Sequence, residues 1–124
     1  MSSSRRVKRT VHAPAAAPEP GSYRLRWSRR AEADLEAIHD YIAADNPVAA
    51  ARWIEKLLVR AEKASLLPYA SRVVPEFGRE DLREVGVRTY RIVYRIRENE
   101  VQVITVFEGH RLFPAEADVE GDPE

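Results

Sequence analysis

Arginine recurs on one side of a segment that has the period of a β-strand. The segment 88–97 reads Arg-Thr-Tyr-Arg-Ile-Val-Tyr-Arg-Ile-Arg, and successive side chains of a strand point to opposite faces. The apolar face carries Tyr90, Ile92, Tyr94 and Ile96, and the other face carries Arg91, Val93, Arg95 and Arg97. Because the apolar face must pack on the core, we expect the arginines on the open side of a sheet.

Such an arginine stripe, joined by Arg83 from a neighbouring strand, could hold phosphates or an acidic peptide. The alternative is a solvated face without a ligand. Its arginines would then form surface ion pairs with Asp81, Glu84 and Glu100, each contributing about 0–1 kcal/mol. Composition alone leaves both interpretations open.

A second polar group follows the apolar segment 101–107. Gly109 lets the backbone bend out of a sheet, which would present His110 and Arg111 near the end of the strand. A histidine can move a proton while a neighbouring arginine holds an anion. Glu84 is a candidate general base. The simpler interpretations are a surface histidine for His110 and an ion-pair partner of Arg83 or Arg91 for Glu84.

Several kinds of site are absent from the sequence. It contains no cysteine, so a disulfide scaffold and a cysteine zinc site are excluded and a cytoplasmic protein is expected. It has no glycine-rich phosphate loop, no Ser-His-Asp grouping and no metal-ligand spacing. No apolar run is long enough to cross a bilayer. We therefore expect no cofactor, no metal and no membrane association.

The neutral overall charge conceals three segments of different charge. The chain has 124 residues, with 20 basic and 20 acidic side chains. Residues 1–30 carry a net charge of +7, residues 31–114 carry −2 and residues 115–124 carry −5. Residues 1–21 are rich in Pro, Ala, Ser and Arg and cannot bury enough apolar surface to order themselves. We therefore expect a disordered basic arm over 1–21, one domain over 22–114 and an acidic tail over 115–124.

Two helices and several strands are expected to position the polar residues. A short strand over 23–27 precedes Ser28, which can cap a helix with apolar residues four, three and four apart from Ala31 to Ile42. Asn46 and Pro47 begin a second helix, which Leu67-Pro68 ends. Strands follow over 81–87, 88–97 and 101–107, and one over 71–74 is left open. The order β-α-α-β-β-β predicts an α+β domain, with a helical hairpin packed on one face of a mainly antiparallel sheet.

The ordered set of segments resembles the RelE/ParE superfamily of type II toxin–antitoxin toxins, most closely its ParE-like branch. The resemblance spans Tyr23–Pro114 and keeps the order of the elements. The motifs that carry it are Ala31-x3-Leu35-x2-Ile38-x2-Tyr41-Ile42, Asn46-Pro47-x2-Ala50, Leu67-Pro68, Leu82-Arg83-Glu84-Val85, Tyr90-Arg91-Ile92-Val93-Tyr94-Arg95-Ile96, Val103-Ile104-Thr105-Val106-Phe107 and Gly109-His110-Arg111.

The resemblance implies a small bacterial toxin that a cognate antitoxin neutralises, with oligomers formed through the antitoxin. ParE-like members inhibit DNA gyrase, whereas RelE-like members are enzymes that cleave mRNA on the ribosome without a metal. An acidic antitoxin segment is expected on the basic sheet face, bound by charge complementarity to Arg83, Arg91, Arg95 and Arg97.

The branch determines which residues would act. RNA cleavage would use Arg91 and Arg111, with His110 as a proton shuttle and Glu84 as a base. The lysines of the RelE pattern are missing, since Leu82 and Glu84 stand at their positions, and no tyrosine follows Phe113. We therefore expect a ParE-like gyrase inhibitor. A ribosome-dependent mRNA endonuclease is the first alternative, and a non-toxic protein- or RNA-binding module is the second.

Overall fold

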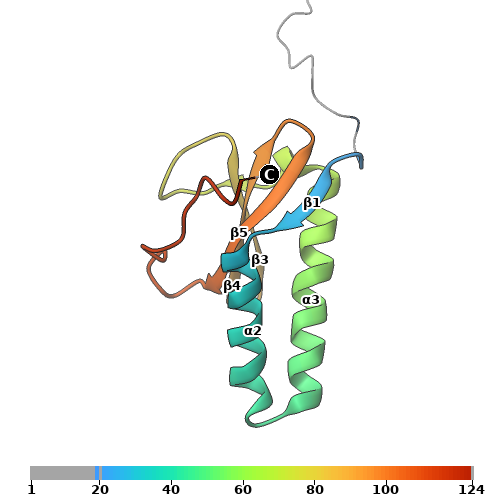
Figure 1. Cartoon of the computed structure of the whole chain (residues 1–124), viewed down its shortest axis with the longest axis vertical. Helices are drawn as coiled ribbons and strands as arrows, with labels where there is room; N and C mark the ends of the chain where they lie inside the picture. The colour runs from blue at the N-terminus through green and yellow to red at the C-terminus, as the bar shows by residue number, and fades with distance from the viewer. Residues whose placement is uncertain (1–18, 20, 124) are drawn as a thin grey trace, which may run out of the picture.

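The elements of the computed structural model follow the expected order, and the α+β architecture is confirmed (Figure 1). The structure describes Glu19 and residues 21–123, so the arm expected over 1–21 lies almost wholly outside the described residues. The first half contains strand β1 (Arg24–Trp27), helices α2 (Arg29–Ala43) and α3 (Pro47–Leu66) and the 3-10 turn η3 (Pro68–Ala70). The second half contains strands β2 (Arg72–Val73), β3 (Leu82–Val87), β4 (Tyr90–Arg97) and β5 (Glu100–Glu108).

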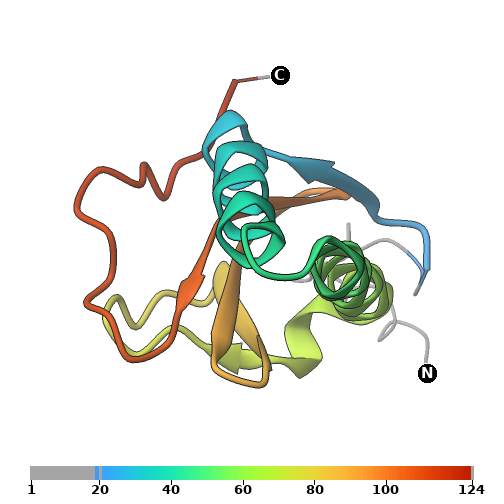
Figure 2. The same cartoon turned by 90° about the horizontal axis from the view of Figure 1, so that it is seen from below.

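The strands form one mixed sheet in the order β1-β5-β4-β3-β2. β1 runs parallel to β5, and every other neighbouring pair is antiparallel. β5 therefore lies inside the sheet, between β1 and β4, and its side chains are buried on both faces. The helices α2 and α3 lie side by side as a hairpin against one face of this sheet (Figures 1 and 2).

The helices begin where the sequence supplies caps. The Ser28 hydroxyl accepts a hydrogen bond from the backbone N–H of Ala31 at 3.0 Å and donates to the carbonyl of Ile104 at 2.9 Å. Asn46 accepts from the backbone N–H of Ala49 at 3.0 Å and precedes a proline at the first helical position. Ser28 therefore both starts α2 and attaches that start to β5.

Asp34 of α2 completes the edge of β5 beyond the end of β1. β1 reaches only as far as Val103, so the next part of β5 has no strand on that side. The Asp34 carboxylate accepts from the backbone N–H of Val106 at 3.0 Å and from the Thr105 hydroxyl at 2.6 Å. A helix side chain thus supplies the missing edge acceptor and keeps α2 aligned with the sheet.

The main core lies between the helices and the apolar face of β4, as expected. Ile92, Tyr94 and Ile96 are buried there with Leu57 of α3 and Ala31 of α2. The Tyr94 hydroxyl donates to the carbonyl of Pro68 at 2.7 Å, so this buried polar group is satisfied. Among the described residues, no helix combines the length and apolar character that crossing a membrane requires.

The opposite face, here called the far face, is not the open solvated face that the sequence analysis expected. It carries a second apolar cluster, whose buried members are Val74, Leu82, Val93, Ile104 and Phe107. A β-bulge shifts the register of β4 and β5 between Val93 and Tyr94, so the alternation along β5 changes phase: Val103 and Val106 both face the helices, and Ile104 and Phe107 both face away from them. The far face therefore needs a cover.

The cover is the segment that the sequence analysis expected to be an acidic tail. Residues 113–122, here called the C-terminal strap, cross the far face, and Phe113 and Val119 pack against its cluster. Phe113 meets the rings of Phe77 and Phe107 edge-on, with centroids 5.0 and 5.3 Å away. A boundary after residue 114 therefore does not separate the domain from a free tail. The sequence analysis considered only the net charge of residues 115–124. It therefore did not identify the apolar side chain there that packs on the far face.

Candidate functional site

The structure divides the predicted arginine stripe. Arg91 and Arg95 point to the far face, and Arg97 is exposed at the end of β4. Arg83 does not join them. It is 8% exposed, and its guanidinium donates to the carbonyls of Tyr69, Ser71 and Glu80 at 2.9, 2.8 and 2.9 Å. Because β3 alternates faces and Arg83 is paired with Tyr94, it lies on the helix side at the edge of the sheet. Its hydrogen bonds connect the η3 turn to β3 there.

Arg91 is held between two carboxylates. Its side chain is 16% exposed and donates from Nε to Glu84 at 2.9 Å and from both terminal nitrogens to Glu76 at 2.9 and 2.8 Å. The Phe107 ring lies 4.9 Å from the guanidinium carbon. Hydrogen bonds from Arg91 lower the pKa of Glu76, and those bonds in turn raise the pKa of Arg91. The positive charge is therefore already compensated within the chain.

Glu84 is equally committed. It is 7% exposed, and its second oxygen accepts from Nε of Arg72 at 2.6 Å. A general base must be free to take a proton from a substrate, whereas this carboxylate is buried between two arginines. The ion-pair interpretation of Glu84 therefore describes its surroundings, with Arg72 and Arg91 as partners and not Arg83.

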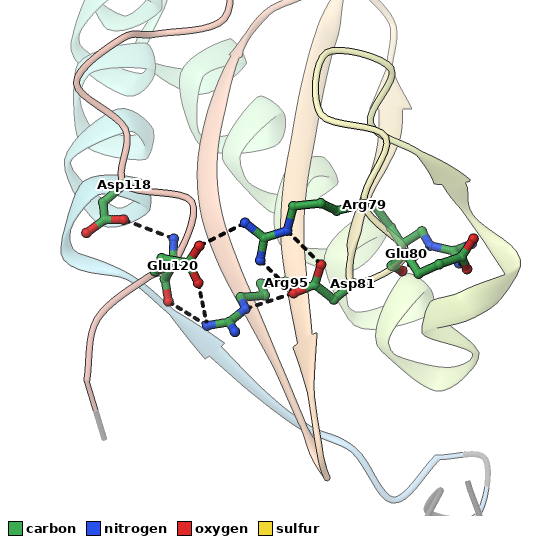
Figure 3. Close-up of polar contacts among 7 residues, drawn as sticks. Arg79, Glu80, Asp81, Arg95, Asp118 and Glu120 are labelled. Atoms are coloured by element: carbon green, nitrogen blue, oxygen red, sulfur yellow. Dashed lines mark hydrogen bonds and ion pairs between the residues drawn. The ribbon is translucent and has the colours of Figure 1, made fainter. Parts of the chain in front are cut away.

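Arg95 belongs to a four-residue network shown in Figure 3. Asp81 accepts from Arg95 at 3.1 Å and from Arg79 at 2.8 Å. Glu120 of the C-terminal strap pairs with Arg79 at 2.8 Å and with Arg95 at 3.3 Å. The hydrogen bond from Arg79 lowers the pKa of both carboxyl groups, so each stays ionised at neutral pH. Two arginines thus face two carboxylates, and no excess positive charge is left here.

His110 and Arg111 lie in the exposed turn after β5. Gly109 makes this turn possible, because a Cβ there would lie 3.0 Å from the carbonyl oxygen of Thr89 and 3.3 Å from Cγ of Arg91. The turn therefore begins against the aliphatic part of Arg91. Of the four predicted catalytic residues, Arg91 and Glu84 are in contact and already paired, whereas His110 and Arg111 stand free of the sheet.

Glu100, which was expected to form an ion pair with the arginine stripe, pairs with other arginines. Glu100 is 4% exposed and pairs with Arg24 at 3.1 Å and Arg26 at 3.5 Å, both on the parallel strand β1. It therefore stabilises the edge of the sheet and does not compensate Arg97.

The sequence analysis missed a different cationic surface, on α3. Its members lie four, four and three residues apart and so share one helix face: Arg52, Lys56, Arg60 and Lys63. Within the described part of the chain, none of them approaches a carboxylate oxygen to within 4.0 Å. They line a groove, here called the α3 groove, with Glu55, Val59, Gly86 and Val87. The helical spacing places these charged residues on the outer face of the helix, but the sequence analysis did not consider that face as a binding surface.

One side of the α3 groove is an open strand edge. β2 pairs only with Arg83 and Glu84, so across the described residues Val85–Val87 have no strand neighbour on that side. At the end of the groove, Trp53 lies 5.4 Å from Nζ of Lys56 and 5.9 Å from the guanidinium carbon of Arg88. Arg88 has a φ of +56°, a backbone conformation that is uncommon for a non-glycine residue. The groove thus combines free cations, apolar side chains and unpaired backbone groups.

A search of the described residues finds no group of three or more side chains that could hold a metal ion. The chemistry available on these surfaces is therefore the binding of anionic groups by arginine and lysine, together with the exposed imidazole of His110.

Comparisons with known proteins give a consistent result. A family model described as ParE toxin of type II toxin-antitoxin system, parDE, matches residues 25–113. Toxin RelE2 of Caulobacter vibrioides is 34% identical over 86 residues, which cover 69% of this chain and 94% of the relative. The protein Y4kP of Sinorhizobium fredii is 33% identical over 94 residues, which cover 73% and 93%. A chain from a chromosomal ParDE toxin–antitoxin system of P. aeruginosa shares the fold, with a TM-score of 0.61 and 20% identity over 71% of this chain and 97% of that one.

Proposed function

The chain belongs to the family of ParE toxins of type II toxin–antitoxin systems, and we propose that it stops bacterial growth by poisoning DNA gyrase. An antitoxin is therefore its expected partner. The choice of gyrase over mRNA goes beyond family membership, and it depends on what the candidate nuclease residues can do.

The observation that carries this choice is the pairing of Arg91. Metal-free RNA cleavage needs basic side chains that stabilise the negative charge that develops on the phosphate. Arg91 already donates to Glu76 and Glu84, and an incoming phosphate would have to displace two carboxylates from it. Arg95 is compensated in the same way by Asp81 and Glu120. This loss of free positive charge supports a protein that acts by binding its target.

We further propose that the antitoxin binds in the α3 groove. The four unpaired cations of α3 would pair with its acidic side chains, and Val59 and Val87 would contact its apolar ones. The open edge at Val85–Val87 can accept a further strand through backbone hydrogen bonds. This replaces the docking surface expected from the sequence, because Arg91 and Arg95 are already compensated within the chain.

A reaction with purified components tests the target. The toxin, DNA gyrase, ATP and supercoiled DNA together should accumulate broken DNA, and omission of gyrase or of ATP should abolish the breaks. Intact DNA at a toxin concentration that arrests growth would contradict the gyrase proposal.

Ribosome-dependent cleavage of mRNA is kept as a second candidate for two reasons. One relative that is 34% identical is named Toxin RelE2, and His110 and Arg111 are exposed where RNA could reach them. Cuts in mRNA that require ribosomes and that disappear in Arg91→Ala and His110→Ala, with gyrase unaffected, would establish this candidate instead.

A further inference from the structure

The C-terminal strap is attached to the far face by side chains. Glu120 pairs with Arg79 and Arg95, and the terminal nitrogen of Arg95 also donates to the Glu120 carbonyl at 3.0 Å. The Asp122 carboxylate accepts from the first backbone N–H of α2, that of Arg29, at 2.7 Å. The backbone N–H of Asp122 donates to Oε1 of Gln102 at 2.9 Å. With Phe113 and Val119 in the apolar cluster, these contacts hold an acidic, extended segment.

These contacts are of a kind that can be released locally. The backbone hydrogen bonds recorded for residues 115–123 are local turns within the segment, and none joins it to a strand. The Glu120 side chain is 56% exposed, and exposed ion pairs contribute little to stability. Leu112, just before the strap, is 91% exposed. A segment with few buried contacts and no sheet hydrogen bonds belongs to the part of a protein that opens at low free-energy cost.

The strap leaves one buried polar group beneath it without a partner. Gln102 is 5% exposed, and its Nε2 has no hydrogen-bond partner among the described residues, although its Oε1 is bonded to Asp122. A buried donor without an acceptor destabilises the closed form. Buried apolar side chains lie beside it, and Ile104 is 1% exposed. Removal of the strap would therefore expose an apolar patch, two arginines and an unused amide donor.

We propose that the far face is a peptide-binding surface, that the C-terminal strap closes it within the chain, and that an extended acidic segment of a partner protein takes the place of the strap. The strap itself defines the chemistry of that segment. It needs an aromatic anchor near Phe77 and Phe107, an aliphatic anchor followed by a carboxylate for Arg79 and Arg95, and a carbonyl oxygen that can accept from Nε2 of Gln102. The match to the toxin family ends at residue 113, so the strap after Phe113 lies beyond the matched region. The inference does not depend on the cellular target of the toxin.

Gly121 supplies a selective way to open the strap. It has a φ of +79°, and a Cβ there would lie 1.9 Å from Oε1 of Gln102 and 3.1 Å from Cδ1 of Ile104, so in Gly121→Ala the strap and the Gln102 side chain must move apart. Gly78 is a matched control, because it also has a positive φ, of +63°, but a Cβ there would meet nothing within 4 Å. Both changes impose similar backbone strain, and only the first disturbs the contact between the strap and the far face.

The test measures how tightly the full-length protein binds a fluorescent peptide that copies residues 112–123. The wild-type strap competes with this peptide, and apparent affinity falls with the fraction of molecules that are open. Gly121→Ala should bind the peptide at least tenfold more tightly than the wild type and Gly78→Ala do. Adding Arg95→Ala to Gly121→Ala should remove this gain, whereas adding Arg97→Ala should leave it.

Circular dichroism establishes that each variant is folded. If Gly121→Ala does not fold, Val119→Ser loosens the strap without a backbone change, and Ala115→Ser is its control on an exposed position. Equal peptide affinity in the folded strap variants and their controls would overturn the proposal. A single-stranded oligonucleotide that displaces the peptide at lower concentration than unlabelled peptide does would also overturn it, since the surface would then favour nucleic acid.

Discussion

Two surfaces of this small toxin carry similar positive charge and use it in opposite ways. On the far face, Arg91, Arg95 and Arg79 are each bonded to carboxylates of the same chain. In the α3 groove, the cations of α3 have no such partner among the described residues. The number of arginines is therefore a poor guide to a binding surface. What distinguishes the two is whether the chain has already compensated the charge.

The charged residues of the two surfaces also differ in what they contribute to the stability of the fold. Arginine–carboxylate pairs that are partly buried help hold the β3–β4 region and the strap in place. Like charges four residues apart on a helix destabilise it by a few tenths of a kcal/mol, so Arg52, Lys56 and Arg60 gain nothing for the fold by standing together. This arrangement is what the proposed binding of the antitoxin in the α3 groove would use.

The largest predicted effect compares the apolar residues of the two surfaces. Leu82 is fully buried in the far-face cluster, and Leu82→Ala should lower the free energy of unfolding by about 2–5 kcal/mol. Val59 is 43% exposed in the α3 groove, and Val59→Ala should lower the free energy of unfolding by less than about 0.5 kcal/mol. Urea denaturation measures both. Similar losses for the two variants would show that the far face is not the second core described above.

The next effect compares one cation from each surface. Arg91→Ala removes the partner of Glu76 and one of two partners of the buried Glu84, and it should destabilise the protein by about 1–3 kcal/mol. Arg60→Ala, in the groove, should change stability by no more than about 0.5 kcal/mol. Thermal unfolding of the two variants side by side provides the measurement. A neutral Arg91→Ala would mean that its carboxylate contacts contribute nothing to the fold.

A pH titration should detect the pairing on the far face. The pKa values of Glu76, Asp81 and Glu120 are lowered from ordinary values of 4.5, 3.8 and 4.5, chiefly by hydrogen bonds from arginine. A carboxyl with a lowered folded-state pKa stabilises the protein above its unfolded pKa, and that stability is lost as pH falls through the folded value. Stability should therefore decrease from about pH 5 to pH 3. Arg79→Gln should flatten this decrease, and an unchanged slope would argue against the network.

The smallest effect on stability is predicted in the α3 groove. Lys56→Glu replaces two repulsive four-residue spacings, to Arg52 and Arg60, by attractive ones, which should stabilise α3 by about 0.2–0.5 kcal/mol. Loss of the Lys56–Trp53 contact reduces this gain. A precise comparison of denaturation midpoints with the wild type would detect it. Marked destabilisation would show that Lys56 has a structural partner after all.

Much of the fold could be predicted because local signals agreed with the global arrangement. The caps at Ser28 and Asn46, the helical spacing of apolar residues and the alternation in β4 all have their predicted consequences. The bulge beside Tyr94 could not be predicted, because it depends on the register of β4 against β5 and not on either strand alone. This bulge turns Phe107 to the far face, where its ring meets that of Phe113.

The candidate site was less predictable, for a related reason. Strand alternation correctly put Arg91 and Arg95 on one face, but their partners come from distant segments, Glu76 from a loop and Glu120 from the strap. Arg83 was assigned to the wrong face of the sheet. It lies on the helix side, and the carbonyl groups that accept its hydrogen bonds come from Tyr69 and Ser71, in and next to η3. Residues 115–124 were expected to be a tail because Val119 is isolated among acidic and small residues. Contacts between such distant segments leave no local pattern.

The most direct test of the central claim is the affinity of the cognate antitoxin for matched charge variants of the two surfaces. The account predicts that Lys56→Glu combined with Arg60→Glu weakens binding at least tenfold, whereas Arg95→Gln, beneath the closed strap, changes it less than threefold. The opposite ranking, with antitoxin affinity lost in Arg95→Gln and kept in the α3 variant, would contradict the account and return the docking surface to the arginine stripe.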